Sequence, residues 1–359
     1  MRRLPFAGHV RTVLAATGMA LSLAGAPTAQ AQTETCTTQS ALPAAERTAI
    51  AEAAHRIATA VLANDAAALR SAAAPDLARE FGALQYLVAT TSPKLAGDTP
   101  VVSQVYLLDA TKLTPNADGS AVEAQFFCSL NRTAAEVEFD IPSLPAGRYG
   151  FAIVDLTSGS STNVPWRISF LLRQLPPNTG PWLLAGLYPR QLTAAGHDGL
   201  WYWEQARQFT KSKQPWNAWV FYQTALRLVQ PAPFLNSTHL EKLRTEASTA
   251  APPALVEGVS SDAPLVVKGP NGTEFHFTSL AADDTASASG VAPSLDLAVH
   301  FNADPLPDQA AARQRNLAAA AALLSAYPEL RKPFHGVEVS ADVKGQQSVS
   351  SAFQMAEIH

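Results

Sequence analysis

The sequence has little charge and lacks the short motifs that most catalytic sites need. Charged residues make up 16% of its 359 residues, and no cluster of Lys or Arg stands out. Nucleic acids and anionic membranes bind basic patches, so neither is expected as a partner. We find no nucleophile elbow, phosphate-binding loop, zinc signature or paired-carboxylate motif. The sequence therefore predicts no catalytic residue, no metal and no cofactor, and an enzyme is the less favoured interpretation.

Long apolar runs are also scarce, and the clearest one lies near the N-terminus. It follows the basic stretch MRRLPFAGHVR and precedes Ala29 and Ala31, small residues at the positions that signal peptidase prefers. At about 15 residues it is too short to span a bilayer comfortably. We expect a signal peptide over residues 1–31, cleavage after Ala31, and a periplasmic or secreted protein without a membrane span. An uncleaved membrane anchor is the alternative.

Cysteine is rare, and the chain contains two, Cys36 and Cys128. An even count in an oxidising compartment favours a disulfide between them. Cys36 lies in a polar tail, residues 32–43, that has little reason of its own to be ordered, whereas Cys128 lies in a predicted strand. The bond would pin the tail across the sheet and close a loop of about 90 residues. The alternative is a buried Cys128 thiol with a free, exposed Cys36 thiol.

The remaining pattern predicts an α+β protein whose first elements are helices. Ile50, Ala54, Ile57 and Val61 recur at helical spacing and form one apolar stripe, with His55 on the polar side. The dipeptide at 64–65 and the proline at position 75 mark breaks, so two further short helices are expected.

Short strands rich in β-branched and aromatic residues follow, from about residue 101 to residue 190. The order of helices and then strands, from TAIAEAAHRIATAVLANDAAALRSAAAP to PWRISFLLRQLPPNTGPWLLAGLY, resembles the NTF2-like family. That resemblance implies helices on a curved antiparallel sheet over residues 44–195. A β-sandwich formed by residues 120–190 is the competing interpretation.

The NTF2-like resemblance also implies a cone-shaped pocket. Some members of that family place acid–base pairs inside it, and the candidates here at predicted strand ends are Tyr106, Asp109, Tyr149 and Asp155. Residues 56–196 contain no histidine, which disfavours a histidine base but leaves a carboxylate base open.

Aromatic residues form 8% of the chain, yet four of its six tryptophans lie between residues 196 and 231. Two helices are predicted there and a third follows, giving a helical unit over residues 196–250. The first two resemble a single tetratricopeptide unit through Tyr202, Ala206, Ala218, Tyr222, Ala225 and Pro231.

We find no second copy of this unit, and one helical hairpin cannot bury its apolar face alone. The favoured interpretation is that Trp201, Trp203, Trp216 and Trp219 attach the unit to the preceding sheet or to the C-terminal part. The alternatives are an aromatic groove for a protein, peptide, glycan or apolar small ligand, or a homodimer surface.

Residues 251–359 are expected to form a small α+β domain. It begins with a hairpin around Asn271 and Gly272, and a helix should run from Asp304 to about Tyr327. A final hairpin closes the chain. Three histidines in this domain, at positions 276, 300 and 335, lie on separate predicted strands and could converge on a metal ion, but the sequence shows no such convergence and no metal site is predicted.

The sequence as a whole favours an exported, non-catalytic binding or interaction protein. The alternatives are an NTF2-like pocket enzyme, such as an isomerase or hydrolase with a carboxylate acid/base, and an envelope assembly factor.

Overall fold

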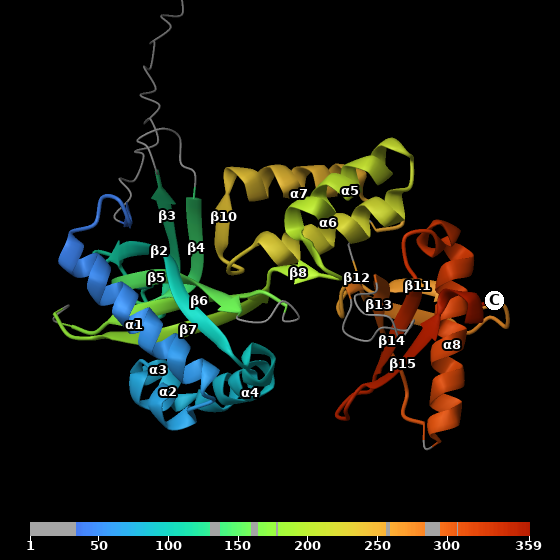
Figure 1. Cartoon of the computed structure of the whole chain (residues 1–359), viewed down its shortest axis with the longest axis horizontal. Helices are drawn as coiled ribbons and strands as arrows, with labels where there is room; N and C mark the ends of the chain where they lie inside the picture. Colours follow the sequence, from blue (N-terminus) through green and yellow to red (C-terminus); the bar gives the residue numbers. More distant parts are fainter. Residues whose placement is uncertain are drawn as a thin grey trace, which may run out of the picture. The chain divides into compact units, whose positions relative to one another are not determined.

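The computed structural model describes residues 34–129, 137–158, 164–176, 179–255, 259–283, 295–306 and 308–359. The expected signal peptide, residues 1–31, and part of the predicted turn at 177–180 lie outside these residues. Helices and mainly antiparallel sheets alternate in the described part, so the α+β class is confirmed (Figure 1). No helix in these ranges is both long and apolar enough to cross a membrane.

The larger N-terminal sheet is antiparallel and has apolar side chains on both faces. Its strand order is β1 (Thr35–Thr38), β2 (Asp98–Ala110), β5 (Gly147–Ser158), β6 (Trp166–Gln174) and β7 (Trp182–Gln191). Successive side chains of a strand point to opposite faces. On β5, Ala152 and Val154 therefore join one core, whereas Phe151 and Ile153 join another. A sheet that is apolar on both faces needs a cover on each.

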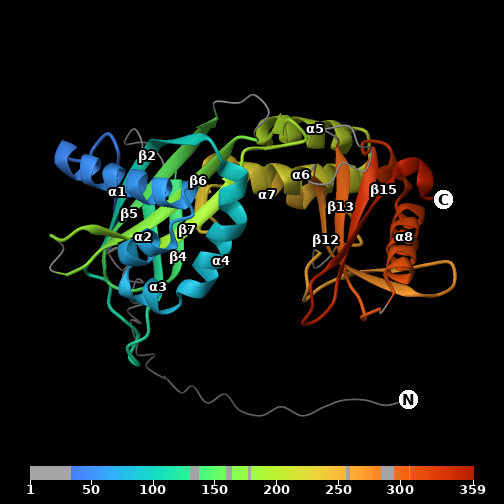
Figure 2. The ribbon, with the colours of Figure 1, turned by 60° about the horizontal axis from the view of Figure 1, so that its bottom comes forward.

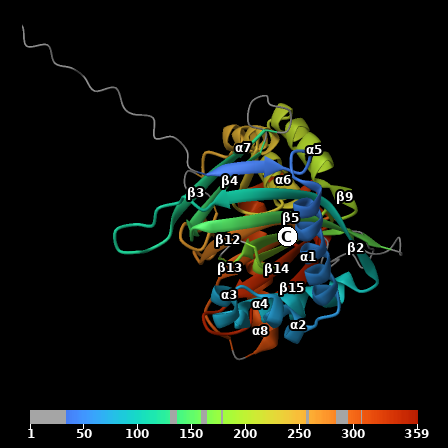
Figure 3. The same cartoon turned by 90° about the vertical axis from the view of Figure 1, so that its left-hand side faces the viewer.

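Helices cover the first face. They are α1 (Ala44–Leu62), α2 (Ala66–Ala72), α3 (Pro75–Arg79) and α4 (Phe81–Thr91), followed by the short helix η1 (Ser92–Leu95). The predicted stripe on α1 is buried, Ile50 and Val61 completely, and His55 is exposed as expected. α1 crosses the strands of the sheet (Figure 3), and Figure 2 shows the other helices on the same side.

A second, three-stranded sheet covers the other face. Its order is β10 (Leu235–Ser237), β4 (Val137–Leu144) and β3 (Val122–Cys128). The NTF2-like resemblance implies that β3 and β4 continue the curved sheet, but they do not. They pair with each other and bury Phe126 and Phe139 against Phe151 of β5. The short strand β10, which the sequence did not reveal, comes from the chain beyond α6 and adds to β4.

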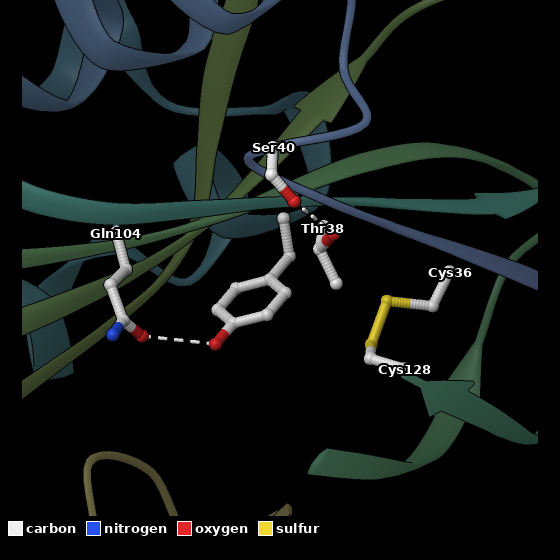
Figure 4. The surroundings of a disulfide bond; sticks show 6 residues. Cys36, Thr38, Ser40, Gln104 and Cys128 are labelled. Atoms are coloured by element: carbon white, nitrogen blue, oxygen red, sulfur yellow. Dashed lines mark hydrogen bonds between the residues drawn. A yellow bond between two sulfur atoms is a disulfide. The ribbon is translucent and has the colours of Figure 1, made fainter. Parts of the chain in front are cut away.

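The N-terminal tail corrects a prediction, because part of it is a strand. Residues Thr35–Thr38 form β1 and pair antiparallel with β2, opposite Tyr106–Asp109. Cys36 is disulfide-bonded to Cys128 of β3, with 5.2 Å between the Cα atoms, so the predicted bond is present (Figure 4). The polar residues are ordered because the edge of β2 supplies backbone partners and the disulfide holds β1 beside β3.

The helical unit begins after the two-residue strands β8 (Thr193–Ala194) and β9 (His197–Asp198). It contains α5 (Gly199–Lys211), α6 (Pro215–Val229) and α7 (Thr238–Ala250). Asp198 caps α5 by accepting a hydrogen bond from the Trp201 amide at 2.8 Å. A Cβ added at Gly199 would lie 2.3 Å from Val229, so glycine lets α5 begin against the end of α6.

The C-terminal part is a five-stranded sheet with one helix. The strands are β11 (Leu265–Lys268), β12 (Glu274–Asp283), β13 (Asp296–Asn302), β14 (Gly336–Asp342) and β15 (Val349–Gln354). β13 and β14 are the single parallel pair among the described strands. The chain between them forms α8 (Gln309–Ala326) and η2 (Pro328–Arg331), and η3 (Met355–Glu357) follows β15. The helix begins later than the predicted Asp304, because the Asp308 carboxylate caps the Ala310 and Ala311 amides.

Candidate functional site

An apolar cavity of about 290 Å³ lies where the second face of the larger sheet meets the helical unit. β2 and β5 provide its floor, β4 and β10 one wall, and α5 and α7 the other. Ten of the lining residues have apolar or aromatic side chains: Tyr106, Val137, Ile153, Leu200, Trp203, Val229, Pro231, Leu235, Leu240 and Leu243. The remaining three are polar: Gln104, Ser237 and His239. The volume is at the lower end of the range of small-molecule sites, roughly 300–1,000 Å³.

Trp203 forms part of the α5 wall, and its orientation is fixed by a polar network. Its indole Nε1 donates a hydrogen bond to Glu246 Oε2 at 2.7 Å. Arg207 binds both oxygens of the same carboxylate, at 2.7 and 2.8 Å, and its guanidinium lies over the Trp203 ring. The hydrogen bonds from Arg207, assisted by that from Trp203, lower the pKa of Glu246 to about 2. The indole is therefore held in place before any ligand arrives.

Tyr106 lies on the floor of the cavity and is held by a ring contact and a hydrogen bond. Its ring packs edge-on against Phe139 at 5.4 Å between centroids, and its hydroxyl donates to Gln104 Oε1 at 2.9 Å. Leu200, 57% exposed, and the exposed His239 stand at the opening. No Asp or Glu is among the described residues that line the cavity. The site can thus exclude water from an apolar group and offers polar contacts near its mouth.

The other three tryptophans of the helical unit lie outside this cavity. Trp216 and Trp219 are buried in the core that α5–α7 share with the C-terminal sheet. The Trp216 ring lies 3.8 Å from that of Tyr327, and its amide donates to Glu329 Oε1 at 2.7 Å. Trp201 is half-buried and stacks on His197 at 3.7 Å. These contacts match the attachment interpretation for Trp216 and Trp219, whereas Trp203 is the tryptophan that faces a cavity.

The four residues considered for a cone pocket do not form one site. Tyr106 lines the cavity, but Asp109 accepts hydrogen bonds from the amide and hydroxyl of Thr111 in a turn. Asp155 forms an ion pair with Arg167 at 2.7 Å.

Tyr149 is buried, and its hydroxyl donates to the Pro145 carbonyl at 2.7 Å. Burial raises the pKa of Tyr149 to about 12, so it stays protonated at neutral pH. The helix-covered face, where the NTF2-like resemblance would place a pocket, holds a packed core in which Ile50, Phe170 and Leu172 are fully buried.

The C-terminal histidines make separate contacts. His300 Nδ1 lies 3.2 Å from Asp342 Oδ2, and His276 lies 3.9 Å from the carboxylate of Glu274. Over the described ranges, no three His, Cys, Asp or Glu side chains are arranged to hold a metal ion.

Most of the cavity wall was missed by the sequence reasoning. Leu235 and Ser237 belong to the unpredicted strand β10, and Leu240 and Leu243 to the helix after it. The apolar spacing of Leu240 and Leu243 indicates a buried helix face, but nothing local says what that face meets.

Comparison with known proteins adds no relative. No protein-family model, no curated protein and no solved structure matches this chain, so no family is assigned.

Proposed function

We propose that this protein is an exported, non-catalytic binding protein that holds a small apolar group in the cavity between β2, β4, β10, α5 and α7. The observation that carries the proposal is an apolar cavity with two aromatic lining residues, Trp203 on its wall and Tyr106 on its floor, each held by a hydrogen bond to a neighbouring side chain. Pre-organised walls reduce the entropy cost of binding. Burial of apolar surface supplies the affinity, about 25 cal/mol per Å².

Export is part of this proposal. The Cys36–Cys128 disulfide is compatible with an oxidising compartment, and the leader-like stretch at 1–31 supports periplasmic or secreted placement. We retain as proposals the NTF2-like character of residues 44–195 and the tetratricopeptide-like character of 196–250. The apolar cavity lies on the sheet face opposite the core that α1 covers.

Binding of a neutral apolar fluorophore, N-phenyl-1-naphthylamine, tests the function. We expect saturable binding of one fluorophore per chain. Leu200→Glu should weaken it by about tenfold or more, because a charge replaces an apolar contact at the mouth. Leu200 is largely exposed, so the fold should be retained.

Tyr86→Glu provides the matched control. Tyr86 is 73% exposed on α4 and lines none of the cavity, so its replacement should leave fluorophore binding unchanged. The proposal is wrong if the wild-type protein shows no saturable binding, or if the two variants lose binding equally.

A further inference from the structure

The apolar cavity adjoins a second hollow of different character. This hollow, which we call the polar notch, has a volume of about 330 Å³ and is lined by Thr38, Gln39, Ser40, Arg47 and residues 103–106. Residues 104 and 106 line both spaces. The notch lies where β1 ends, because Thr38 is the last residue paired with β2 (Figure 4).

The polar notch contains two side-chain donors, from Arg47 and Gln104, that no described carboxylate binds. The half-buried Arg47 makes one long hydrogen bond, from Nη1 to the Gln39 carbonyl at 3.4 Å. Across the described residues no carboxylate pairs with it, and its neighbour Glu46 is bound instead to Arg148. Gln104 uses its Oε1 to accept from Tyr106, so its amide nitrogen is left as a donor between the two spaces.

No described residue lining either space is an Asp or a Glu. A guanidinium and an amide donor in spaces that no described carboxylate lines favour an oxyanion, which arginine binds in a fork geometry. An apolar cavity beside such a group is complementary to a molecule with one apolar end and one anionic end.

We propose that the ligand is a single-chain anionic amphiphile, whose alkyl chain fills the apolar cavity and whose carboxylate lies in the polar notch against Arg47. This inference rests on the proposed binding function and names its ligand class. Tyr106 and Gln104 form the boundary over which the chain passes from one space to the other.

Calorimetry on the oxidised, leader-free protein tests the inference with three probes of equal chain length: dodecanoate, dodecanol and dodecyltrimethylammonium. The two ionic probes are kept below their micelle concentrations and dodecanol below its solubility limit. We expect dodecanoate to bind about tenfold more tightly than dodecanol, since one charge-assisted hydrogen bond separates them. The ammonium probe should bind most weakly. Affinity should rise about fourfold per methylene from octanoate until the cavity is full.

Variants of α1 assign the head group. Arg47→Gln should lower the affinity for dodecanoate about tenfold and leave that for dodecanol unchanged, whereas Arg47→Lys should keep part of the preference. Arg56→Gln is the matched control, because Arg56 is exposed on the same helix and lines neither space. Higher ionic strength should weaken dodecanoate alone, a measurement that needs no variant.

The failures are distinguishable. Equal affinities for dodecanoate and dodecanol, with no effect of Arg47→Gln or of salt, would overturn the anionic head group and leave the apolar cavity in place. Tighter binding of the ammonium probe would overturn it as well. If neither a dodecyl probe nor N-phenyl-1-naphthylamine binds, the proposed function itself falls.

Discussion

Removal of the Cys36–Cys128 disulfide should destabilise the protein by about 4 kcal/mol. The bond joins residues 92 apart in the sequence, and cross-linking a loop of that length removes about 4–5 kcal/mol of denatured-state entropy in the loop-closure model. This is an upper estimate. Alanine is the right replacement at both sites, because Cys128 is fully buried and a serine hydroxyl there would lie in an apolar core.

Urea denaturation of the oxidised protein, the reduced protein and the Cys36→Ala/Cys128→Ala variant measures this effect. The reduced protein and the double-alanine variant should share one urea midpoint, well below that of the oxidised protein. Their m-values should be higher, because a chain without the cross-link exposes more surface when it unfolds. Thiol counting on the unreduced, denatured protein should find no free thiol. The intact mass of the exported protein shows in addition whether its chain starts at Gln32. A difference below about 1 kcal/mol, or two free thiols, would refute the reasoning.

The remaining predictions concern the helical unit. Trp219→Ala should destabilise the protein by about 3–5 kcal/mol, the cost of deleting a buried large aromatic side chain. Trp201→Ala should destabilise it by less, because Trp201 is half-buried. Thermal unfolding of the two variants measures the difference. Glu246→Gln should cost about 1–2 kcal/mol near neutral pH, a value that allows for partial screening by water. The pKa of Glu246 is lowered in the folded state, so this stability is present above about pH 4.5 and is lost as pH falls toward 2. The difference in urea midpoint between the wild type and Glu246→Gln should therefore become smaller as the pH falls from 4.5 toward 2. If that difference stays constant, the ion pair does not cause it.

Local features of the fold could be predicted from the sequence because they depend on local chemistry. The stripe from Ile50 to Val61, the cap at Asp198 and the first-turn Pro215 each depend on residues within one or two turns of helix. Likewise, β5 through β7 could be predicted from runs of β-branched and aromatic residues with turn residues between neighbours.

Strand partners were harder, since the same pattern suits several pairings. β3 and β4 alternate apolar and polar residues, a pattern that suits any strand with one buried face, and nothing local shows that they leave the larger sheet to pack on its face. β10 has three residues, too few to carry a pattern, and β1 is polar. Both segments become strands because each lies beside a sheet edge that offers backbone hydrogen-bond partners. That edge exists only in the folded molecule, so the local sequence does not reveal it.

The candidate site shows the same division between local and distant information. Tyr106 and Trp203 were both singled out from the sequence, but for two different sites, and the structure places them on one cavity. They meet because the chain returns after α6, adds β10 to β4 and begins α7 beside that second sheet. The tryptophans crowd into residues 196–231 since that segment must contact two neighbours at once. Trp216 contacts Tyr327 and Glu329 of the C-terminal part, and Trp219 is buried in the core that the two parts share. Trp203, held by Glu246, lines the cavity.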